Sequence, residues 1–467
     1  MTHLNITTCN LTGEVPYEIS SLPKLVSLDL SLNGNMKLED SSLQRLIRNQ
    51  TKLSELFFFL TQVDMSLVLP NSFMNLSSSL TSLCLYDCQL KGRFPYNIFH
   101  LPKLHFLDLR FNHNLTGSIP KYNWSSPLKV LGFSETGFPI DLPNLISNLK
   151  SLRKLCLSGC NFTGSYPRLL PNLIQITSLD LSHNNFGGQI PWSFLKLERL
   201  SFLDLSFNSF TGQLSDVSTN LSELSSSNYS SNSQPFSHTP LKLKFLALSY
   251  NLLNGTIPSW LYSIPCLQRL YLDNNRFTGH TDEFQYNSVR YLDLSNNNLL
   301  GSLPMSISKL VSLYHINVSF NHLSGTMESK MFSKLKILEI VDLSHNPLLS
   351  LSTFNNVSYT LPKLYELYLS SCNINEFLTN LEHLERLDLS HNQIKGNTPT
   401  WFLDVAKDSL RYLNLSNNFL TNIDQLPWKK LGYLDLHSNS IQGPLPIPPI
   451  GISFFSISRN NFSGVIP

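Results

Sequence analysis

The chain has 467 residues, of which 89 are leucine and only 2 are alanine. So little alanine, the strongest helix former, beside so much leucine excludes a helix bundle. Charged residues make up 14% and the formal net charge is +2, which excludes a disordered charged chain and a nucleic-acid-binding protein with a concentrated basic face.

The first 16 residues, MTHLNITTCNLTGEVP, contain neither a basic stretch nor an apolar core, so they do not read as a signal peptide. No run of 18 apolar residues follows anywhere, and we expect no membrane span in this chain.

The pattern LxxLxLxxN recurs from one end of the chain to the other, mostly 24 residues apart. Its last position is Asn in 13 copies, Cys in 4 and Thr in 2. The 19 copies end at residues 9, 33, 61, 88, 112, 136, 160, 184, 208, 251, 275, 297, 321, 346, 372, 392, 418, 439 and 460. This period and motif are the signature of a leucine-rich repeat.

The LxL core predicts a short strand whose leucines point inward, and one repeat cannot bury them without its neighbours. A buried Asn at the last position would bond the backbone of adjacent repeats. We therefore predict a leucine-rich-repeat solenoid of the α/β class, a curved right-handed superhelix of short parallel strands. It would be one domain over residues 1–467 with about 19 repeats, truncated at both ends.

A second motif, GxxP, follows the first in ten copies, for example Gly188–Pro191 and Gly301–Pro304. With it, the chain resembles the plant-type repeat LxxLxLxxNxLxGxIP. The resemblance implies a second short strand near GxIP and a 3₁₀-like or irregular convex side, where we find no helix-period pattern. Segment 215–240, rich in Ser and Asn, breaks the period and reads as a loop insertion or an eroded repeat, with a recognition loop as the other interpretation.

The closing stretch 426–449, LPWKKLGYLDLHSNSIQGPLPIPP, resembles plant receptor-like proteins of the disease-resistance type. The resemblance implies a glycoprotein on the extracellular side of the plasma membrane that signals in plant defence through a partner receptor kinase. The cysteine caps, non-repeat island, membrane span and tail of that family are missing here, so we read the chain as a repeat ectodomain fragment or the product of a truncated gene.

Seven cysteines form no CxxC cluster. Cys9, Cys88, Cys160 and Cys372 occupy the last motif position, where we expect them to be small buried residues in place of Asn. Strand spacing puts Cys84 and Cys156 too far apart for a disulfide.

Fourteen N-x-S/T sequons are present. Two of them, Asn317 and Asn414, lie on strands where a glycan would block the concave face, so their occupancy is left open. The predicted glycosylation sites are Asn5, Asn10, Asn49, Asn75, Asn114, Asn123, Asn161, Asn220, Asn228, Asn254, Asn356 and Asn461.

No catalytic, phosphate-binding or metal-binding motif is recognisable. The 13 histidines are scattered or repeat-linked, and aspartates such as Asp204, Asp293 and Asp342 recur between strand leucines, which we interpret as solvated consensus residues. We expect no enzyme activity, no cofactor and no metal.

The functional information lies in outward strand residues that depart from the repeat, because aromatic residues and Arg are enriched at binding hot spots. One group is Phe57, Phe59, Tyr86, Phe106 and Arg110, and a later one is Glu366, Tyr368, Arg386, Tyr412 and Tyr433. The central group, which we favour as the ligand-binding site, is Phe245, Arg269, Tyr271, Asp273, Tyr291 and His315. Packing of side chains along the sheet is the alternative for each group.

The leading hypothesis is a non-catalytic ectodomain that binds a pathogen-derived or endogenous protein or peptide on its concave face. One alternative is a soluble inhibitor of cell-wall-degrading enzymes of the polygalacturonase-inhibitor type, and another is a non-functional receptor fragment.

Overall fold

A computed structural model describes residues 1–63, 72–76, 78–121, 124–165, 169–191, 194, 197–214, 242–328, 331–332, 334–352, 363–378, 381–423 and 425–464. The chain divides into two compact units, a first unit of residues 1–209 and 233–243 and a second unit of residues 210–232 and 244–467. The expected single domain stays a prediction, and segment 215–240 lies outside the described residues.

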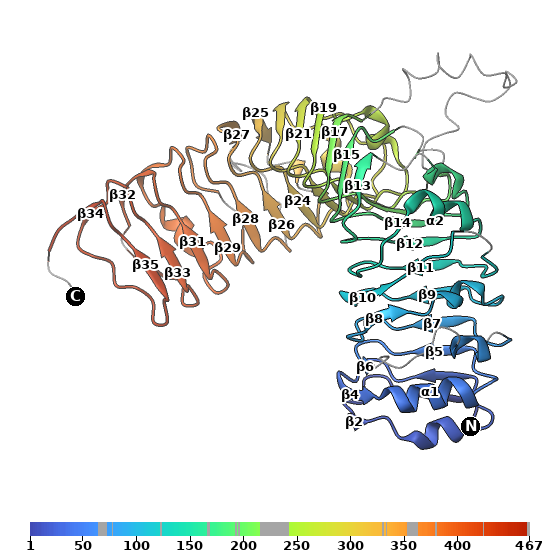
Figure 1. The fold of residues 1–467 in the computed structure, drawn as a ribbon. Coiled ribbons are helices and arrows are strands. Elements are labelled where there is room, and N and C mark those ends of the chain that lie inside the picture. Colours follow the sequence, from blue (N-terminus) through green and yellow to red (C-terminus); the bar gives the residue numbers. More distant parts are fainter. Residues whose placement is uncertain are drawn as a thin grey trace, which may run out of the picture. The chain divides into compact units, whose positions relative to one another are not determined.

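Each repeat contributes one short strand to the parallel main sheet (Figure 1), which confirms the predicted solenoid and its 19 copies. The first unit contains β1 (His3–Asn5), β3 (Ser27–Asp29), β5 (Glu55–Phe57), β7 (Ser82–Cys84), β9 (Phe106–Asp108), β11 (Val130–Gly132), β12 (Lys154–Cys156), β14 (Ser178–Asp180) and β16 (Phe202–Asp204). The second unit contains β18 (Phe245–Ala247), β20 (Arg269–Tyr271), β22 (Tyr291–Asp293), β24 (His315–Asn317), β26 (Ile340–Asp342), β28 (Glu366–Tyr368), β29 (Arg386–Asp388), β31 (Tyr412–Asn414), β33 (Tyr433–Asp435) and β35 (Phe454–Ser456).

Second strands follow at the GxIP segment, as the plant-type resemblance implied. In the first unit they are β2 (Thr12–Glu14), β4 (Asn35–Leu38), β6 (Gln62–Val63), β8 (Lys91–Phe94), β10 (Asn114–Gly117), β13 (Thr163–Ser165) and β15 (Asn185–Gly188). The later ones are β17 (Ser209–Gln213), β19 (Leu252–Thr256), β21 (Arg276–Gly279), β23 (Asn298–Gly301), β25 (His322–Glu328), β27 (Leu348–Ser352), β30 (Lys395–Asn397), β32 (Phe419–Asn422), β34 (Gln442–Gly443) and β36 (Asn461–Phe462).

The core is a column of leucines tied together by a ladder of buried Asn side chains. The middle residue of a main strand, such as Leu203 or Leu387, has no exposed surface. Asn321 is typical of the ladder: its Oδ1 accepts a hydrogen bond from the backbone N–H of Leu299 at 2.9 Å, and its Nδ2 donates to the carbonyl of Leu294 at 2.9 Å. Both residues belong to the preceding repeat, so the predicted role of this Asn is confirmed.

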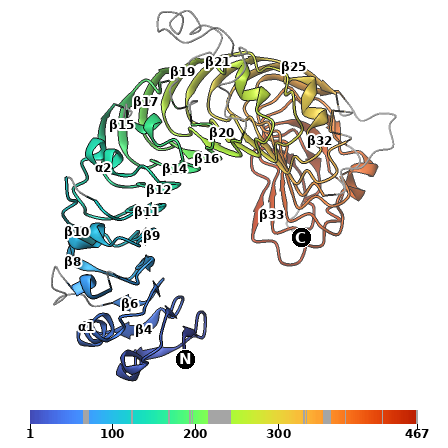
Figure 2. The ribbon, with the colours of Figure 1, turned by 90° about the vertical axis from the view of Figure 1, so that its right-hand side faces the viewer.

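The convex side consists mainly of 3₁₀ helices. Most begin after the proline of GxxP, whose φ near −65° suits a first helical turn, as at Pro304 (φ −68). They are η1 (Tyr17–Ser21), η2 (Ser72–Leu76), η3 (Tyr96–His100), η4 (Leu170–Asn172), η6 (Ser259–Ser263), η7 (Met305–Lys309) and η9 (Thr400–Asp404). Within each unit the main strands line the inner side of the curve, and the helices lie on the outer side (Figure 2).

Two α-helices correct the expectation that helical patterning is absent there: α1 (Asp40–Asn49) and α2 (Leu142–Asn148). In α1, Leu43, Leu46 and Ile47 follow a helical period and are buried. The repeat that carries α1 is the longest of the regular ones, with 28 residues between ladder positions 33 and 61, which leaves room for a ten-residue helix. In the described ranges, no helix is both long enough and apolar enough to span a membrane.

Candidate functional site

The inner face of the main sheet is lined by the first and third residues of each strand, and eight of the 19 strands have Asp at the third. The sequence predicts that these aspartates are solvated, but in the structure they are half-buried or, for Asp108 and Asp435, buried. The carboxylate of Asp388 turns back and accepts hydrogen bonds from the N–H of Ser390 at 2.9 Å and from its hydroxyl at 2.6 Å. In the six repeats that carry it, the motif D-x-S is therefore a structural element that closes the end of the strand.

Burial raises the pKa of three aspartates in this column. Desolvation raises the pKa of Asp204 and of Asp342 above the ordinary range, and it raises the pKa of Asp293 to about 6. The candidate binding groups lie on the same face, partly on strands that carry one of these aspartates, as Tyr291 does beside Asp293.

The group near the N-terminus packs against itself. The rings of Phe59 and Tyr86 meet edge to face at 4.5 Å, and those of Phe57 and Phe106 lie 6.3 Å apart. Arg110 lies 4.9 Å above the Tyr86 ring and forms an ion pair with Asp108 at 2.6 Å. Its charge is therefore already matched within the protein.

The late group is also internally paired. The rings of Tyr412 and Tyr433 stack at 4.4 Å with 14° between their planes. The Glu366 carboxylate accepts a hydrogen bond from the Tyr368 hydroxyl at 3.0 Å and forms an ion pair with Arg386 at 3.7 Å.

The central group occupies adjacent strands of the second unit. Phe245, Arg269, Tyr291 and His315 are register partners at the first position of β18, β20, β22 and β24. The structure therefore brings them together on one face, as the sequence predicted. Whether they bind a ligand stays a prediction at this point.

Ring contacts connect the central group. Phe245 and Tyr271 lie 5.7 Å apart, and the Tyr291 and His315 rings stack at 6.3 Å with 26° between their planes. Arg269 lies 4.8 Å above the Tyr291 ring. Burial lowers the pKa of His315, so this ring is neutral at neutral pH.

Asp273 differs from the other central residues because its side chain is buried. Its carboxylate accepts hydrogen bonds from the Ser249 hydroxyl and from the Asn274 side-chain amide, the latter at 2.8 Å. In six other repeats Asp stands two residues before Ser, whereas here Asp stands at the Ser position and accepts a hydrogen bond from Ser249 of the preceding repeat. The Asp273 carboxylate is therefore engaged in hydrogen bonds within the protein.

Sequence reasoning missed two cations, Lys244 and Arg290, that stand directly before β18 and β22. Both are exposed. The strand pattern does not indicate them because they lie one residue before the strands. A signal was present in the sequence: the two repeats next to Arg269 each have a Lys or Arg directly before the first residue of the strand.

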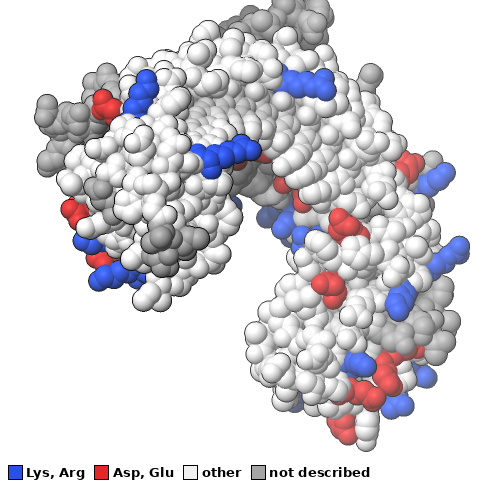
Figure 3. Space-filling view, turned by 90° about the vertical axis from the view of Figure 1, so that its left-hand side faces the viewer, with Lys and Arg blue, Asp and Glu red and all other residues white. Residues whose placement is uncertain are grey.

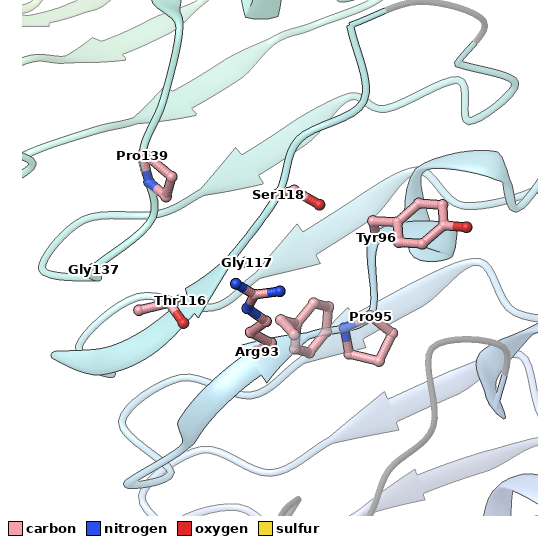
Figure 4. Close-up of a pocket in the computed structure, with 9 residues that line it drawn as sticks. Arg93, Pro95, Tyr96, Thr116, Gly117, Ser118, Gly137 and Pro139 are labelled. Carbon is pink, nitrogen blue, oxygen red and sulfur yellow. The ribbon is translucent and has the colours of Figure 1, made fainter.

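A groove of about 630 Å³ lies away from the main sheet, between β8, β10 and residue 139 (Figure 4). Arg93 and Tyr96 line one side and Pro139 the other. The repeat with ladder residue Thr136 has no second strand within residues 124–165, because Pro139 follows shortly after the ladder position and lacks the N–H that a strand needs. No sequence motif indicated this groove.

All seven cysteines are free. Three ladder cysteines replace Asn as donors, since the thiols of Cys88, Cys160 and Cys372 donate to carbonyls of the repeat before. Cys88 and Cys372 are buried as predicted, Cys160 is only half-buried, and the prediction is wrong for Cys9, which is exposed. Among the described residues its thiol donates to the carbonyl of nearby Thr7, at 3.6 Å, which belongs to its own repeat.

The sequons divide into two kinds. Eight lie in the described part of the chain with exposed Asn side chains: Asn5, Asn10, Asn49, Asn75, Asn114, Asn161, Asn254 and Asn461. Asn317 and Asn414 are half-buried, and their amide nitrogens donate to Asp293 and Asp388. The remaining sites Asn123, Asn220, Asn228 and Asn356 lie outside the described residues, and glycan attachment everywhere stays a prediction.

Among the described side chains, no group of three His, Cys, Asp or Glu residues is arranged to hold a metal ion. Most of the face shown in Figure 3 is neutral, and its charged side chains are few, with several of both signs gathered at the lower end of the view. What the inner face offers chemically is ring surfaces, hydroxyls and isolated cations.

The sequence profile of the Leucine Rich Repeat family matches residues 151–173, 175–197, 242–264, 288–310, 383–404 and 409–431. Receptor-like protein 6 of Arabidopsis thaliana is 35% identical over 160 residues, which cover 33% of this chain and 16% of that protein. Receptor-like protein Cf-9 of Solanum pimpinellifolium is 34% identical over 140 residues, covering 30% of this chain and 16% of that protein. The matched stretch thus spans about a sixth of each curated relative.

Solved structures match nearly the whole chain. The ectodomain of the Arabidopsis receptor kinase HAESA, in complex with an N-terminally extended IDA peptide hormone, is 27% identical with a TM-score of 0.71, covering 99% of this chain and 74% of that one. The ectodomain of the Arabidopsis receptor kinase GASSHO1/SCHENGEN3, in complex with CASPARIAN STRIP INTEGRITY FACTOR 2, is 28% identical with a TM-score of 0.69, covering 100% of this chain and 56% of that one.

Proposed function

We propose that this chain, a leucine-rich-repeat protein of the plant receptor-like type, is the ligand-binding ectodomain of a cell-surface receptor. It binds a protein or extended peptide on the concave face of the second unit, without catalysis, on the extracellular side of the plasma membrane. Signalling then passes to a partner receptor kinase, in plant defence.

One observation carries this proposal: Phe245, Arg269, Tyr291 and His315 stand side by side on four adjacent strands, with Tyr271 next to them. The first and last groups satisfy their charges internally, but this one leaves Arg269 on a ring face. Aromatic residues and Arg at the centre of a surface are typical of binding hot spots. The HAESA ectodomain, which shares this fold, is solved with a peptide hormone, which supports a peptide as the ligand class.

Affinity capture from plant apoplastic fluid tests the proposal. The secreted full chain is compared with the variant Arg269→Ala/Tyr271→Ala and with a matched variant of the late group, Tyr412→Ala/Tyr433→Ala. We expect a protein or peptide that binds the parent and the late-group variant but not the central variant. Equal capture by all three, with all three folded by circular dichroism, would exclude the central face.

A further inference from the structure

The cations of the second unit's inner face fall into two classes. Arg386 forms an ion pair with Glu366 at 3.7 Å, and Arg411 forms one with Glu385 at 3.3 Å. These two arginines, near β29 and β31, therefore face carboxylates of their own chain.

The cations at the other end of the unit lack such carboxylates. In the ranges that the structure describes, Lys244, Arg269 and Arg290 have no acidic side chain within ion-pair distance. All three are exposed. Their backbones are adjacent, because the N–H of Arg269 bonds to the carbonyl of Lys244 and the N–H of Arg290 to that of Gln268.

The acidic groups closest in sequence are already occupied. Asp273 is buried and bonded to Ser249 and Asn274. Asp293 accepts two hydrogen bonds from Ser295, at 3.0 and 2.6 Å, and one from Asn317 at 3.3 Å. These carboxylates are bonded to Ser and Asn residues of their own and neighbouring repeats, and they form no ion pair with the three cations.

The Tyr291 ring positions the Arg269 side chain without neutralising its charge. The guanidinium lies 4.8 Å above the ring, a contact that restricts the side chain and leaves its N–H groups available. Phe245 and Tyr271 supply apolar surface next to it. A positioned guanidinium flanked by rings suits a carboxylate that reaches the face on an extended backbone.

We propose that the ligand of this face is an acidic peptide segment, bound by Lys244, Arg269 and Arg290; this rests on the proposed function. Arg269 begins β20, and Lys244 and Arg290 directly precede the strands on either side of it, so the three residues span about 10 Å. In an extended peptide, carboxylates two residues apart are separated by about 7 Å. Two or three Asp or Glu residues within five positions match the cations, and apolar residues between them contact Phe245 and Tyr271.

Selection of random 12-residue peptides displayed on phage against the secreted full chain tests this inference. The same library is selected against Arg269→Gln/Arg290→Gln and against the matched control Arg386→Gln/Arg411→Gln, whose arginines have internal carboxylates. Thermal unfolding confirms that all three proteins are folded. Enriched peptides are then measured by fluorescence anisotropy at 50 and 500 mM NaCl.

We expect enriched peptides that carry clustered Asp or Glu with aromatic or aliphatic neighbours. Their affinity should fall at least about 10-fold in Arg269→Gln/Arg290→Gln, less than about 3-fold in the control, and clearly at high salt. Neutral or basic consensus peptides, or acidic ones that bind the Arg269→Gln/Arg290→Gln variant equally well, would overturn the inference and leave the proposed function standing.

Two further outcomes are informative. If oligogalacturonate, a polyanionic carbohydrate, binds with the same dependence on Arg269 and Arg290 while no peptide is enriched, the cations recognise carboxylates but the ligand class is wrong. If neither peptides nor any apoplastic protein bind the concave face, the proposed function fails together with the inference.

Discussion

The guanidinium of Arg110 donates two hydrogen bonds to the carboxylate of Asp108, from Nη2 at 2.6 Å and from Nε at 2.8 Å. This bidentate geometry is the strongest that an Arg–carboxylate pair forms. The pair lies across Gly132, the register partner of Asp108 on the next strand. A glycine at the third strand position, where eight of the 19 strands have Asp, thus provides the space in which the Arg110 side chain lies.

The replacement Gly132→Ala should therefore destabilise the first unit. A Cβ on Gly132 would stand 2.7 Å from Asp108 Oδ1 and 3.0 Å from the Cγ and Cδ of Arg110, so the ion pair must shift. We expect a loss of about 1–3 kcal/mol in unfolding free energy, measured by urea denaturation. The control is Gly34→Ala, where the nearest atom is 3.8 Å away; an equal loss in both variants would contradict this account.

The Asn ladder gives a second prediction, at Asn346. This side chain is fully buried; it accepts from Leu323 N–H at 3.0 Å and donates to the carbonyls of Val318 and Leu343 at 3.1 and 2.9 Å. Replacing it by Leu leaves these backbone groups unpaired, and we expect a loss of about 2–4 kcal/mol.

The variant Asn346→Cys should lose less than Asn346→Leu, because Cys372 shows that a thiol at this position still donates to the preceding carbonyl, at 3.2 Å. Asn298→Ala, at an exposed position of the same unit, is the control and should stay within about 0.5 kcal/mol of the parent. Equal unfolding midpoints for Asn346→Leu and Asn346→Cys would show that the ladder acts through volume rather than hydrogen bonds.

The sequence was sufficient to predict the repeats, the strand of each repeat and the role of the ladder, because these depend on residues at fixed spacing. It also predicted which aromatic residues and arginines share a face. Period-2 alternation places side chains on a sheet face without any knowledge of packing.

Other features depend on contacts that a repeat pattern does not contain. Alternation predicts solvated aspartates because it puts them on the outward face, yet where a serine stands two residues later its backbone N–H and its hydroxyl both donate to the carboxylate, as Ser295 does to Asp293. Cys9 shares its motif position with Cys372, but burial there depends on how many repeats pack around it. The unpaired state of Arg269 becomes visible only when every carboxylate around it has been located.

Thiol reactivity should follow burial rather than motif position. Desolvation raises the pKa of Cys84, Cys160 and Cys372 to about 12, so their thiolate fractions at pH 8 fall by roughly three powers of ten, and burial also raises the pKa of Cys88 and Cys156. Cys9 and Cys266 are exposed. A thiol titration with Ellman's reagent at pH 8 should show two fast groups in the folded protein and all seven in urea. Rapid labelling of a third cysteine, located by mass spectrometry, would contradict the packing of the ladder.

Asp293 makes the stability of the second unit depend on pH. Burial, the largest cause, raises its pKa to about 6 in the folded chain, against about 4 in the unfolded chain. Between these pH values the folded state therefore binds more protons than the unfolded state. The free energy of unfolding should fall by about 2 kcal/mol as pH rises from about 4 to 6. Above pH 6 the stabilisation from protonated Asp293 should stay lost.

The variant Asp293→Asn removes this titration, so its stability should vary less across the same window. The side chain of Asn can replace that of Asp here, since on the next strand the amide oxygen of Asn317 accepts both bonds from Ser319, at 3.1 and 2.7 Å. Urea denaturation at half-unit steps from pH 4 to 7 measures the slope for the parent, for Asp293→Asn and for the exposed control Asp282→Asn, which should keep the parent slope. An Asp293→Asn slope as steep as the parent's would mean that other carboxylates of the column, Asp204 or Asp342 among them, cause the pH dependence. A parent that grows more stable from pH 4 to 6 would show that desolvation does not dominate at this site.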